Sequence, residues 1–375
     1  MGAHTDTDAR HLARAVELAA CGGWEVSPNP RVGAVVADAH GRVLGEGYHR
    51  RAGGPHAEVE ALAAVGDAVD LRGATLYVSL EPCAHHGRTP PCTDAIRAAG
   101  IGRVVIASDD PSAHAAGRGL GILRDEGIEV VIAEGAIVTQ ARLLNQPFRK
   151  HARTGRPWVR LKAAMSMDGK VATSSGDSQW ISSEASRALV HRWRAQLDAV
   201  AIGIGTALTD DPRLTARLDP PADRQPRRIV FDSLGRLPLH SRLITETDAG
   251  DLTVVVSRAA PRAATDALEV KGVDVIVATG EHEPARVRCA LDQLGATGVT
   301  SLLLEGGPRL AGAFLDAGEI DEVRFFIAPL LLGGRSRDAV DSSGVDRIAD
   351  AVRPLSFDCE HVGSDLLMSA RLTEW

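Results

Sequence analysis

The sequence has 375 residues, of which 44% are hydrophobic and 24% charged, and its formal net charge is -7 at pH 7. This length predicts two domains, because one domain holds roughly 150 residues, and the composition is that of an ordinary globular protein. The negative net charge gives no electrostatic reason to expect a polyanion partner, which disfavours nucleic acid. The five cysteines are an odd, scattered set, so no disulfide framework is expected.

Neither a targeting segment nor a membrane span is evident. Residues 1–10 are polar and lack the apolar core of a signal peptide, and no apolar run approaches the roughly 20 residues that cross a bilayer. We therefore expect a cytoplasmic protein with no membrane partner. The sequence leaves the oligomeric state open, a homo-oligomer included.

Short β-branched runs alternate with Ala- and Leu-rich stretches over the first 145 residues, which predicts a layered α/β domain. The expected strands begin at Val32, Thr75, Val104 and Val130. Segment 145–157 is basic, contains two prolines and a glycine, and shows no apolar period, so we place the domain junction there, with domains at 1–146 and 147–375. A second α/β pattern follows, with expected strands at 158–165, 199–205, 227–232, 252–257, 274–279, 301–306 and 323–329 and helices at 182–196, 263–270 and 284–294.

Four residues of the first domain form a pattern typical of a catalytic zinc site. His56 and Glu58 follow a Gly-Gly-Pro turn and open a helical run, whereas Cys83 follows an expected strand and Cys92 opens another helical run. Near a helix start the dipole favours the thiolate, the form that binds metal. One imidazole and two thiolates leave the fourth position of a tetrahedral zinc ion for water, whose proton Glu58 would move.

The order of these residues matches part of the zinc deaminase signature. In that class the zinc-bound hydroxide attacks the ring carbon that carries the amine, and a Glu that does not bind zinc protonates the leaving nitrogen. The signature is H-x-E followed by P-C-x-x-C, but here eight residues separate the cysteines. The simpler alternative is that His56 caps a helix and both cysteines are small buried side chains, which accounts for each residue but not for the joint pattern.

Two other functions are consistent with the four residues. One is a base or nucleoside deaminase, acting for example on tRNA, joined to an unrelated domain; the acidic balance and the long insert between the cysteines oppose it. The other is a nucleotide-sensing protein with a structural zinc ion. Such a site normally has four protein ligands and needs no neighbouring Glu.

The second half lacks a strand-linked G-x-G-x-x-G with a following acidic residue, since the string from Gly203 matches it only weakly. Glu305 and the residues Gly306 to Pro308 lie where an expected strand meets a helix, and bare backbone amides there can receive a phosphate. A plain strand-to-helix turn explains them equally well. Trp193 and Leu197 share one helical face and are expected in the core, and Cys289 is expected to be structural.

Longer motifs resemble the bifunctional riboflavin-biosynthesis deaminase-reductases. The first half is similar to that family over NPRVGAVV, EGYHRRAGGPHAEVEAL and EPCAHHGRTPPC, which holds the long inter-cysteine insert that is the family's hallmark. The second half is similar over RPWVRLKAAMSMDGKVA, GDSQWIS, RAQLDAVAIGIGTALTDDPRLTAR and LLLEGGPRLAGAFLDAG. The resemblance covers nearly the whole chain. It implies a cytidine-deaminase-like three-layer domain followed by a dihydrofolate-reductase-like α/β domain.

The resemblance also implies two successive reactions on a small pyrimidine ribonucleotide. The first domain would use one zinc ion to deaminate a diamino-ribosylamino-pyrimidinone 5′-phosphate. The second would reduce the ribosyl group of the aminouracil product to ribityl with NADPH.

Site residues follow by position in the family. In the deaminase, Glu58 would be catalytic, zinc would bind His56, Cys83 and Cys92, and the nucleotide would contact Asn29, His49, Arg88 and Asp110. The guanidinium of Arg88 suits a phosphate because it can bond two oxygens at once. The family's Asp-Pro-Asn is here 110–112 with Ser112 last, so a serine hydroxyl or a water would substitute for the Asn contact.

In the reductase, Lys162 with Glu305 would orient the sugar carbonyl and supply the proton that accompanies hydride. By family position, the sugar phosphate would contact Ser178, Arg194, Leu214, Arg217 and Glu305. NADPH would contact Ala164, Trp180, Thr206, Asp210, Ser233, Gly307, Pro308, Arg309 and Leu310.

Overall fold

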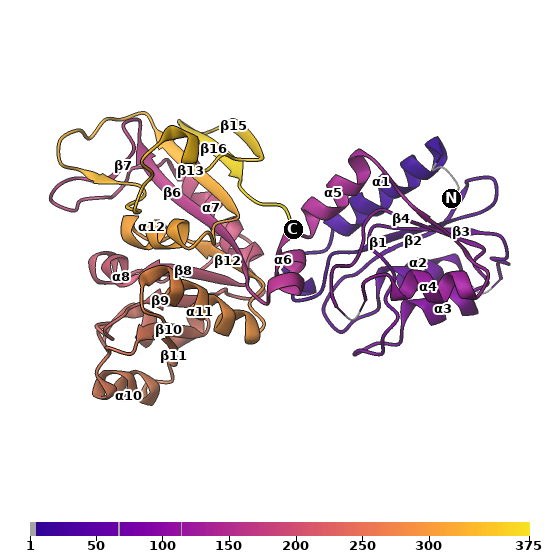
Figure 1. The fold of residues 1–375 in the computed structure, drawn as a ribbon, viewed down its shortest axis with the longest axis horizontal. Coiled ribbons are helices and arrows are strands. Elements are labelled where there is room, and N and C mark those ends of the chain that lie inside the picture. The colour runs from indigo at the N-terminus through magenta and orange to yellow at the C-terminus, as the bar shows by residue number, and fades with distance from the viewer. Residues whose placement is uncertain (1–4, 67, 114) are drawn as a thin grey trace. The chain divides into compact units, whose positions relative to one another are not determined.

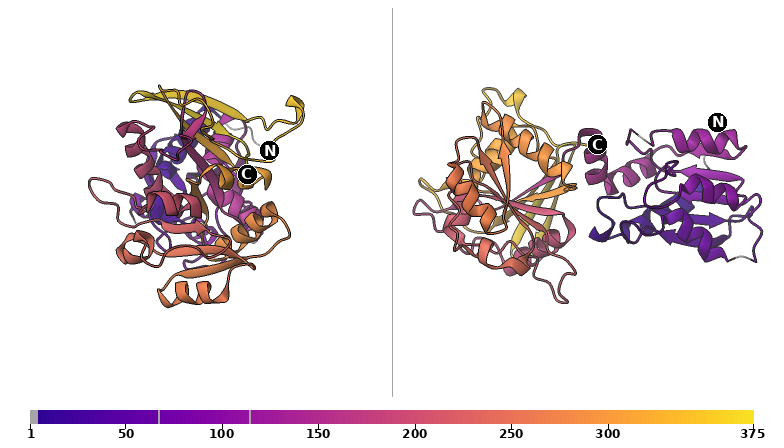
Figure 2. Two further views of the ribbon diagram at one scale, coloured as in Figure 1. Left: turned by 90° about the vertical axis from the view of Figure 1, so that its left-hand side faces the viewer. Right: turned by 90° about the horizontal axis from the view of Figure 1, so that it is seen from below.

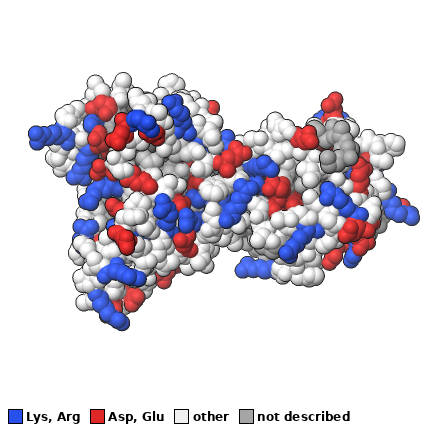
Figure 3. Space-filling model, viewed as in Figure 1, with Lys and Arg blue, Asp and Glu red and all other residues white. Residues whose placement is uncertain are grey.

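A computed structural model describes residues 5–66, 68–113 and 115–375 of the chain (Figure 1). The chain forms two compact units, one of residues up to Thr154 together with Trp375, and one of Gly155–Glu374. Among the described residues, no helix is both long and apolar enough to cross a membrane. On the face drawn in Figure 3, acidic and basic side chains are interspersed.

The first unit is built on a five-stranded sheet of order β2-β1-β3-β4-β5. Strand β1 is antiparallel to both β2 and β3, whereas β3, β4 and β5 are parallel. The four predicted strands are present. The additional edge strand β2 escaped prediction because its sequence VLGEGY holds two glycines and only partly buried side chains. The strands are β1 (Gly33–Ala37), β2 (Val43–Tyr48), β3 (Thr75–Val78), β4 (Arg103–Ile106) and β5 (Glu129–Ile132).

Helices cover both faces of this sheet, which makes the three layers that the resemblance implies (Figures 1 and 2). Val35 and Ala37 of β1 pack against the helices on one face of the sheet, and Ala34 and Val36 pack against the helices on the opposite face. This alternation is the two-residue period of a strand with both faces buried. Helices α1 (Asp6–Ala20) and α5 (Ala136–Leu144) lie on one side, and α2 (Ala57–Val65), α3 (Cys92–Ala98) and α4 (Arg118–Asp125) lie on the other.

The segment in which we expected the domain junction contains a further helix, α6 (Gln146–Thr154), which belongs to the first unit. Its buried residues are polar: Gln146, Arg149 and Lys150. A helix that buries polar side chains shows no apolar period, so the sequence pattern could not indicate it. The limits 1–146 and 147–375 stay a prediction.

The second unit contains a nine-stranded sheet of order β11-β10-β9-β8-β12-β6-β13-β16-β15. The seven strands from β11 to β13 are parallel, whereas β16 and β15 add antiparallel pairs at one edge. The parallel strands are the seven that the sequence predicts. They are β6 (Trp158–Ser166), β8 (Ala199–Gly203), β9 (Arg227–Phe231), β10 (Leu252–Ser257), β11 (Asp274–Ala278), β12 (Ser301–Leu304) and β13 (Glu322–Ala328).

The strands that sequence reasoning missed are β15 (Ser356–Val362) and β16 (Asp365–Arg371), together with the short pair β7 (Lys170–Ala172) and β14 (Arg337–Asp338). Strand β15 is exposed over most of its length, so it lacks an apolar run. Three helices of this unit, α7 (Glu184–Gln196), α10 (Arg262–Val270) and α11 (Glu283–Ala296), are the predicted ones. The others are α8 (Ile204–Asp210), α9 (Arg242–Thr245) and α12 (Pro308–Asp316).

The core of the second unit lies between the parallel strands and α11 and α12, where Leu302 and Leu304 pack with Leu291 and Phe314. Trp193 and Leu197 are both buried, and the Trp193 ring stacks on Phe326 with ring centroids 5.4 Å apart. The prediction that they belong to the core is confirmed. Because β8, β9, β10, β11 and β12 are parallel, their carboxyl ends meet at one edge of the sheet, where ligands of such sheets usually bind.

Two candidate active sites

The three predicted zinc ligands lie together in the first unit. Their ligand atoms all lie within 4.8 Å of one another. His56 Nδ1 is 3.1 Å from Cys92 Sγ and 3.5 Å from Cys83 Sγ. Two ligand atoms that share a tetrahedral zinc ion are about 3.5 Å apart when the Zn–N and Zn–S bonds are about 2.0 and 2.3 Å long. The three side chains therefore fit a zinc ion.

Local structure explains how residues so far apart in sequence converge. His56 is the N-cap of α2 and Cys92 is the first residue of α3. Cys83 lies in the preceding loop, and its sulfur accepts a hydrogen bond from the Cys92 backbone amide at 3.3 Å. Hydrogen bonds from the Cys92 thiol and amide lower the pKa of the Cys83 thiol, whereas the Cys83 sulfur, burial and Glu58 raise the pKa of Cys92. Cys83 is thus prepared as a thiolate, the state that binds metal.

Glu58 lies beside this cluster in the first turn of α2, with a side chain that is 3% exposed. Burial raises the pKa of Glu58 to about 7, against the opposing influence of His56. A carboxyl group with a pKa near neutrality can both take up and release a proton at the working pH. Zinc on three protein ligands would supply a bound water of pKa about 7 as the nucleophile.

Thr89 is a site residue that sequence reasoning missed. Its hydroxyl oxygen lies 3.2 Å from His56 Nε2, on the side of the ring away from the cysteines. Such a contact fixes the orientation and tautomer of a ligating imidazole. The only available signal was its place inside the inter-cysteine insert.

Two of the predicted nucleotide-binding residues are joined by hydrogen bonds. The Asn29 amide donates to His49 Nε2 at 3.1 Å, so His49 carries its proton on Nδ1 and donates it to the Pro55 carbonyl at 2.8 Å. Burial lowers the pKa of His49, which favours this neutral form. The His49 ring also meets His56 edge-on with centroids 5.3 Å apart, which places the pair beside the zinc ligands.

Arg88 is exposed and lies close to the turn before His56. A Cβ atom added at Gly53 would lie 3.6 Å from Arg88 Cδ. Gly53 has a φ of 79°, which a residue with a side chain rarely adopts. The long insert between the cysteines therefore places the Arg88 side chain beside the turn that precedes α2.

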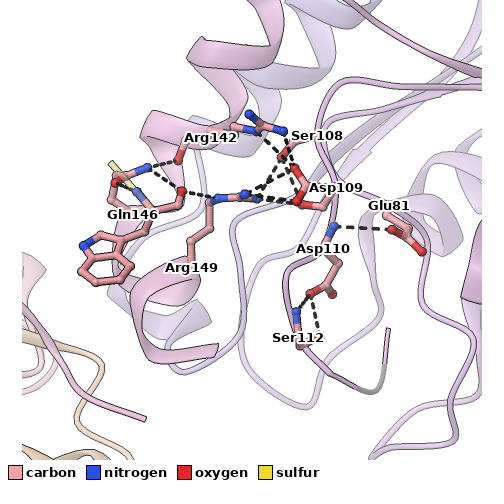
Figure 4. Close-up of polar contacts among 9 residues, drawn as sticks. Glu81, Ser108, Asp109, Asp110, Ser112, Arg142, Gln146 and Arg149 are labelled. Atoms are coloured by element: carbon pink, nitrogen blue, oxygen red, sulfur yellow. Dashed lines mark hydrogen bonds and ion pairs between the residues drawn. The ribbon is translucent and has the colours of Figure 1, made fainter. Parts of the chain in front are cut away.

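Asp110 and Ser112 are buried in the turn that follows β4 (Figure 4). The Ser112 amide and hydroxyl both donate to Asp110 Oδ1, at 2.8 and 2.6 Å. The hydroxyl that we expected to substitute for the family's Asn is therefore engaged with Asp110. Glu81, two residues before Cys83, accepts from the Asp110 amide at 3.5 Å and from the Gly117 amide at 2.8 Å.

In the second unit, Arg194, Glu305 and Lys162 form a largely buried ionic cluster. Arg194 donates to the two Glu305 carboxylate oxygens at 2.6 and 3.0 Å, and Lys162 Nζ lies 3.7 Å from Glu305 Oε2. Burial would raise the pKa of Glu305, but Arg194 and Lys162 lower it to about 2. Burial also lowers the pKa of Lys162, although Glu305 opposes this. A lysine whose pKa falls is a better proton donor at neutral pH.

Arg217 is held by His191, a second residue that sequence reasoning did not single out. The guanidinium donates to His191 Nε2 at 2.9 Å, so His191 carries its proton on Nδ1, which donates to the Thr215 carbonyl at 3.1 Å. Arg194 donates to the same carbonyl at 3.1 Å. Burial and the two arginines lower the pKa of His191 to about 4, so the imidazole is neutral.

A cavity of about 890 Å³ opens at the carboxyl ends of the parallel strands. It is large enough for a dinucleotide. Predicted cofactor residues that line it are Thr206, Ser233, Gly307, Pro308, Arg309 and Leu310. Gly203, whose string looked weak as a fingerprint, is the N-cap of α8 and also lines the cavity.

Ala164, Trp180 and Asp210 do not appear among the described lining residues of this cavity. Trp180 is largely exposed, and the Arg187 guanidinium lies over its ring at 4.6 Å. Leu214 is buried with a φ of 58°, and Ser178 is half-buried. The roles of these five residues stay predictions.

Comparison with known proteins supports both halves. The model for the cytidine and deoxycytidylate deaminase zinc-binding region matches residues 5–108, and the RibD C-terminal domain matches residues 157–367. The riboflavin biosynthesis protein RibD of Escherichia coli K12 is 42% identical over 96% of this chain and 98% of its own length. The chain belongs to the RibD family. Its relative from Actinobacillus pleuropneumoniae is 40% identical over 97% of this chain and 95% of its own length.

Solved RibD structures share the same two-unit fold. Acinetobacter baumannii RibD, form 1, matches with a TM-score of 0.84 at 36% identity, over 98% of this chain and 99% of the other. A Thermotoga maritima diaminohydroxyphosphoribosylaminopyrimidine deaminase/5-amino-6-(5-phosphoribosylamino)uracil reductase matches with a TM-score of 0.81 at 35% identity, over 98% and 99%. The resemblance, the fold class, the zinc-binding region and the bifunctional enzyme class are confirmed: the chain is a RibD enzyme of riboflavin biosynthesis with a deaminase and a reductase activity.

Proposed function

We propose that the first unit deaminates the diamino-ribosylamino-pyrimidinone 5′-phosphate by zinc-assisted hydrolysis. The observation that carries this proposal is the convergence of one imidazole and two thiols beside the buried Glu58. Glu58 would accept a proton from the attacking water and deliver it to the leaving nitrogen. His49 and Asn29 would hold the pyrimidine, and Arg88 would hold the 5′-phosphate.

The test of this proposal is Glu58→Gln, which keeps the shape of the side chain and removes its proton transfer. Ammonia release from the nucleotide should fall by about 10²–10⁴, while zinc content stays at one ion per chain. The control Glu17→Gln changes an exposed glutamate of α1, which is paired with Arg14. Full ammonia release by the zinc-loaded Glu58→Gln protein would overturn the proton-transfer role.

We further propose that the second unit reduces the ribosyl group of the aminouracil product with NADPH. The cavity at the strand ends would hold the cofactor, and residues Gly307 to Leu310 at the start of α12 line it. Arg194 and Arg217 would bind the sugar phosphate, and Lys162 would donate the proton that accompanies hydride. The other family-position residues, Ala164, Trp180, Asp210, Ser178 and Leu214, complete this proposed site.

Absorbance at the NADPH band, with the aminouracil nucleotide supplied directly, measures this activity without the deaminase. NADPH should support a faster reaction than NADH. Equal rates with both cofactors would contradict the cofactor assignment.

A tRNA substrate is the alternative for the first unit. On the face in Figure 3, basic side chains are interleaved with acidic ones, which is unlike the continuous basic surface that binds a phosphate backbone.

A further inference from the structure

Two arginines converge on Asp109, the residue before the proposed nucleotide contact Asp110 (Figure 4). Arg142 of α5 donates to Asp109 Oδ1 from Nε at 3.1 Å and from Nη2 at 2.8 Å. Arg149 of α6 donates from Nη2 to both carboxylate oxygens, at 3.3 and 3.2 Å. These helices lie outside the deaminase motifs, so this contact is not part of the site described above.

Arg149 is held in place on every side of its guanidinium, and its side chain is only 1% exposed. Besides Asp109 Oδ1 and Oδ2, it donates from Nη1 to the Asp109 carbonyl at 2.7 Å and to the Ser108 hydroxyl at 3.2 Å. Its Nε donates to the main-chain oxygen of Trp375 at 2.5 Å, and Gln146 binds the backbone of that same residue. A buried guanidinium is stable only when its donors are satisfied in this way.

The turn that Arg149 grips is fixed from the other side by Glu81. The Glu81 amide donates to the Ser108 carbonyl at 2.9 Å, and its carboxylate accepts from the Asp110 amide. Ser108 and Asp109 are therefore held between Glu81, next to the zinc loop, and Arg149. A turn that is held at both ends presents Asp110 in one orientation. Substrate binding then does not have to order the turn, so it loses less conformational entropy.

We propose that Arg149 is a positioning residue of the deaminase, which acts through Asp109 to fix the turn that carries Asp110 and Ser112. The proposal rests on the proposed contact of Asp110 with the nucleotide. Arg142, which is partly exposed, adds to the grip on Asp109, whereas only Arg149 also binds the backbone of the turn. Arg149 touches neither the zinc ligands nor Glu58, so the variants should change substrate binding more than the chemical step.

The experiment measures ammonia release by the full-length, zinc-loaded protein for Arg149→Met and Asp109→Asn. KM for the pyrimidine nucleotide should rise about tenfold, which corresponds to a lost contact of about 1.4 kcal/mol, whereas kcat should change by less than about threefold. Arg153→Met is the matched control, since Arg153 lies on the same helix but is exposed. Its KM should equal that of the wild type.

Three further readouts separate positioning from general destabilisation. Zinc content and NADPH oxidation on the aminouracil nucleotide should be unchanged in each variant. The Asp109→Asn carboxamide should be tolerated by the fold because this side chain is 44% exposed, so it carries the test if Arg149→Met does not fold. The double variant should have a KM no higher than the worse single variant, because both changes break one contact.

Several outcomes would overturn the inference. One is an unchanged KM in Asp109→Asn; another is a parallel loss of ammonia release, zinc and reductase activity; a third is a double variant whose effects multiply. Asp110→Ala separates this inference from the function beneath it. If the wild type is active and Asp110→Ala raises KM while the Arg149 and Asp109 variants do not, only the inference fails. If the wild type releases no ammonia from the nucleotide, the proposed deaminase function fails.

Discussion

Replacing Glu305 by Gln should destabilise the second unit by about 3 kcal/mol at pH 7. Glu305 follows β12 with a side chain that is 9% exposed, and it pairs with Arg194 and Lys162. Burial would raise its pKa, but the two cations lower it from 4.5 to about 2. A difference of about 2.5 pH units between the unfolded and folded states corresponds to about 3 kcal/mol. In the variant, the two cations would also face each other without the carboxylate.

The pH dependence has a defined sign because the pKa is lower in the folded state. The stabilisation by ionised Glu305 is complete above pH 4.5 and is lost as the pH falls towards 2. The difference between wild type and variant should therefore shrink to about two fifths by pH 3. Urea unfolding followed by the fluorescence of the buried Trp158 and Trp193 measures it.

The matched control for this measurement is Glu360→Gln on the exposed strand β15, where a change below about 0.5 kcal/mol is expected. A difference below about 1 kcal/mol for Glu305→Gln at pH 7, or one that does not narrow at low pH, would refute the reasoning. Either result would mean that Arg194 and Lys162 do not hold the carboxylate in its ionised form.

Two further predictions concern the packing around each site. Gly119→Ala should lower the free energy of unfolding by about 1–3 kcal/mol and weaken zinc retention during dialysis, because the added Cβ would lie 2.2 Å from the Pro82 carbonyl oxygen, beside Cys83. The control is Gly121→Ala, whose Cβ would have nothing within 4 Å, and equal zinc retention in the two variants would count against this coupling. His191→Phe should raise the reductase KM for the aminouracil nucleotide about tenfold, because the hydrogen bond to Arg217 is lost. The control is His240→Phe, which changes an exposed histidine, and an unchanged KM in His191→Phe would show that Arg217 does not depend on His191.

The sequence predicts those features whose signal is local. The central strands of the second unit are buried on both faces, so they read as continuous apolar runs, whereas β2 and β15 lie at or near a sheet edge and have no such run. The zinc ligands were predictable for a related reason. His56, Cys83 and Cys92 are chemically distinctive, and each follows a recognisable turn or helix start.

The partners of the site residues could not be predicted in this way. Arg149 meets Asp109 across 40 positions of the chain, and Arg217 meets His191 across 26. No periodicity records such a pairing, and an arginine in a basic segment has the pattern of a solvated surface residue. Burial of Arg149 depends on the packing of α6, which only the folded structure shows. Family resemblance therefore located the groups that would touch substrate but not those that hold them.

In both units an arginine fixes a carboxylate that lies just after the end of a strand. In the first, Arg149 grips Asp109 after β4, and in the second, Arg194 grips Glu305 after β12. A carboxylate at a strand end can adopt several orientations, and a guanidinium that is itself largely buried favours the ionised form and one orientation. Because neither arginine needs to change state during the reaction, removing one should loosen the substrate before it slows the chemistry. The effect of each variant on KM relative to kcat is thus the quantity that tests the shared design.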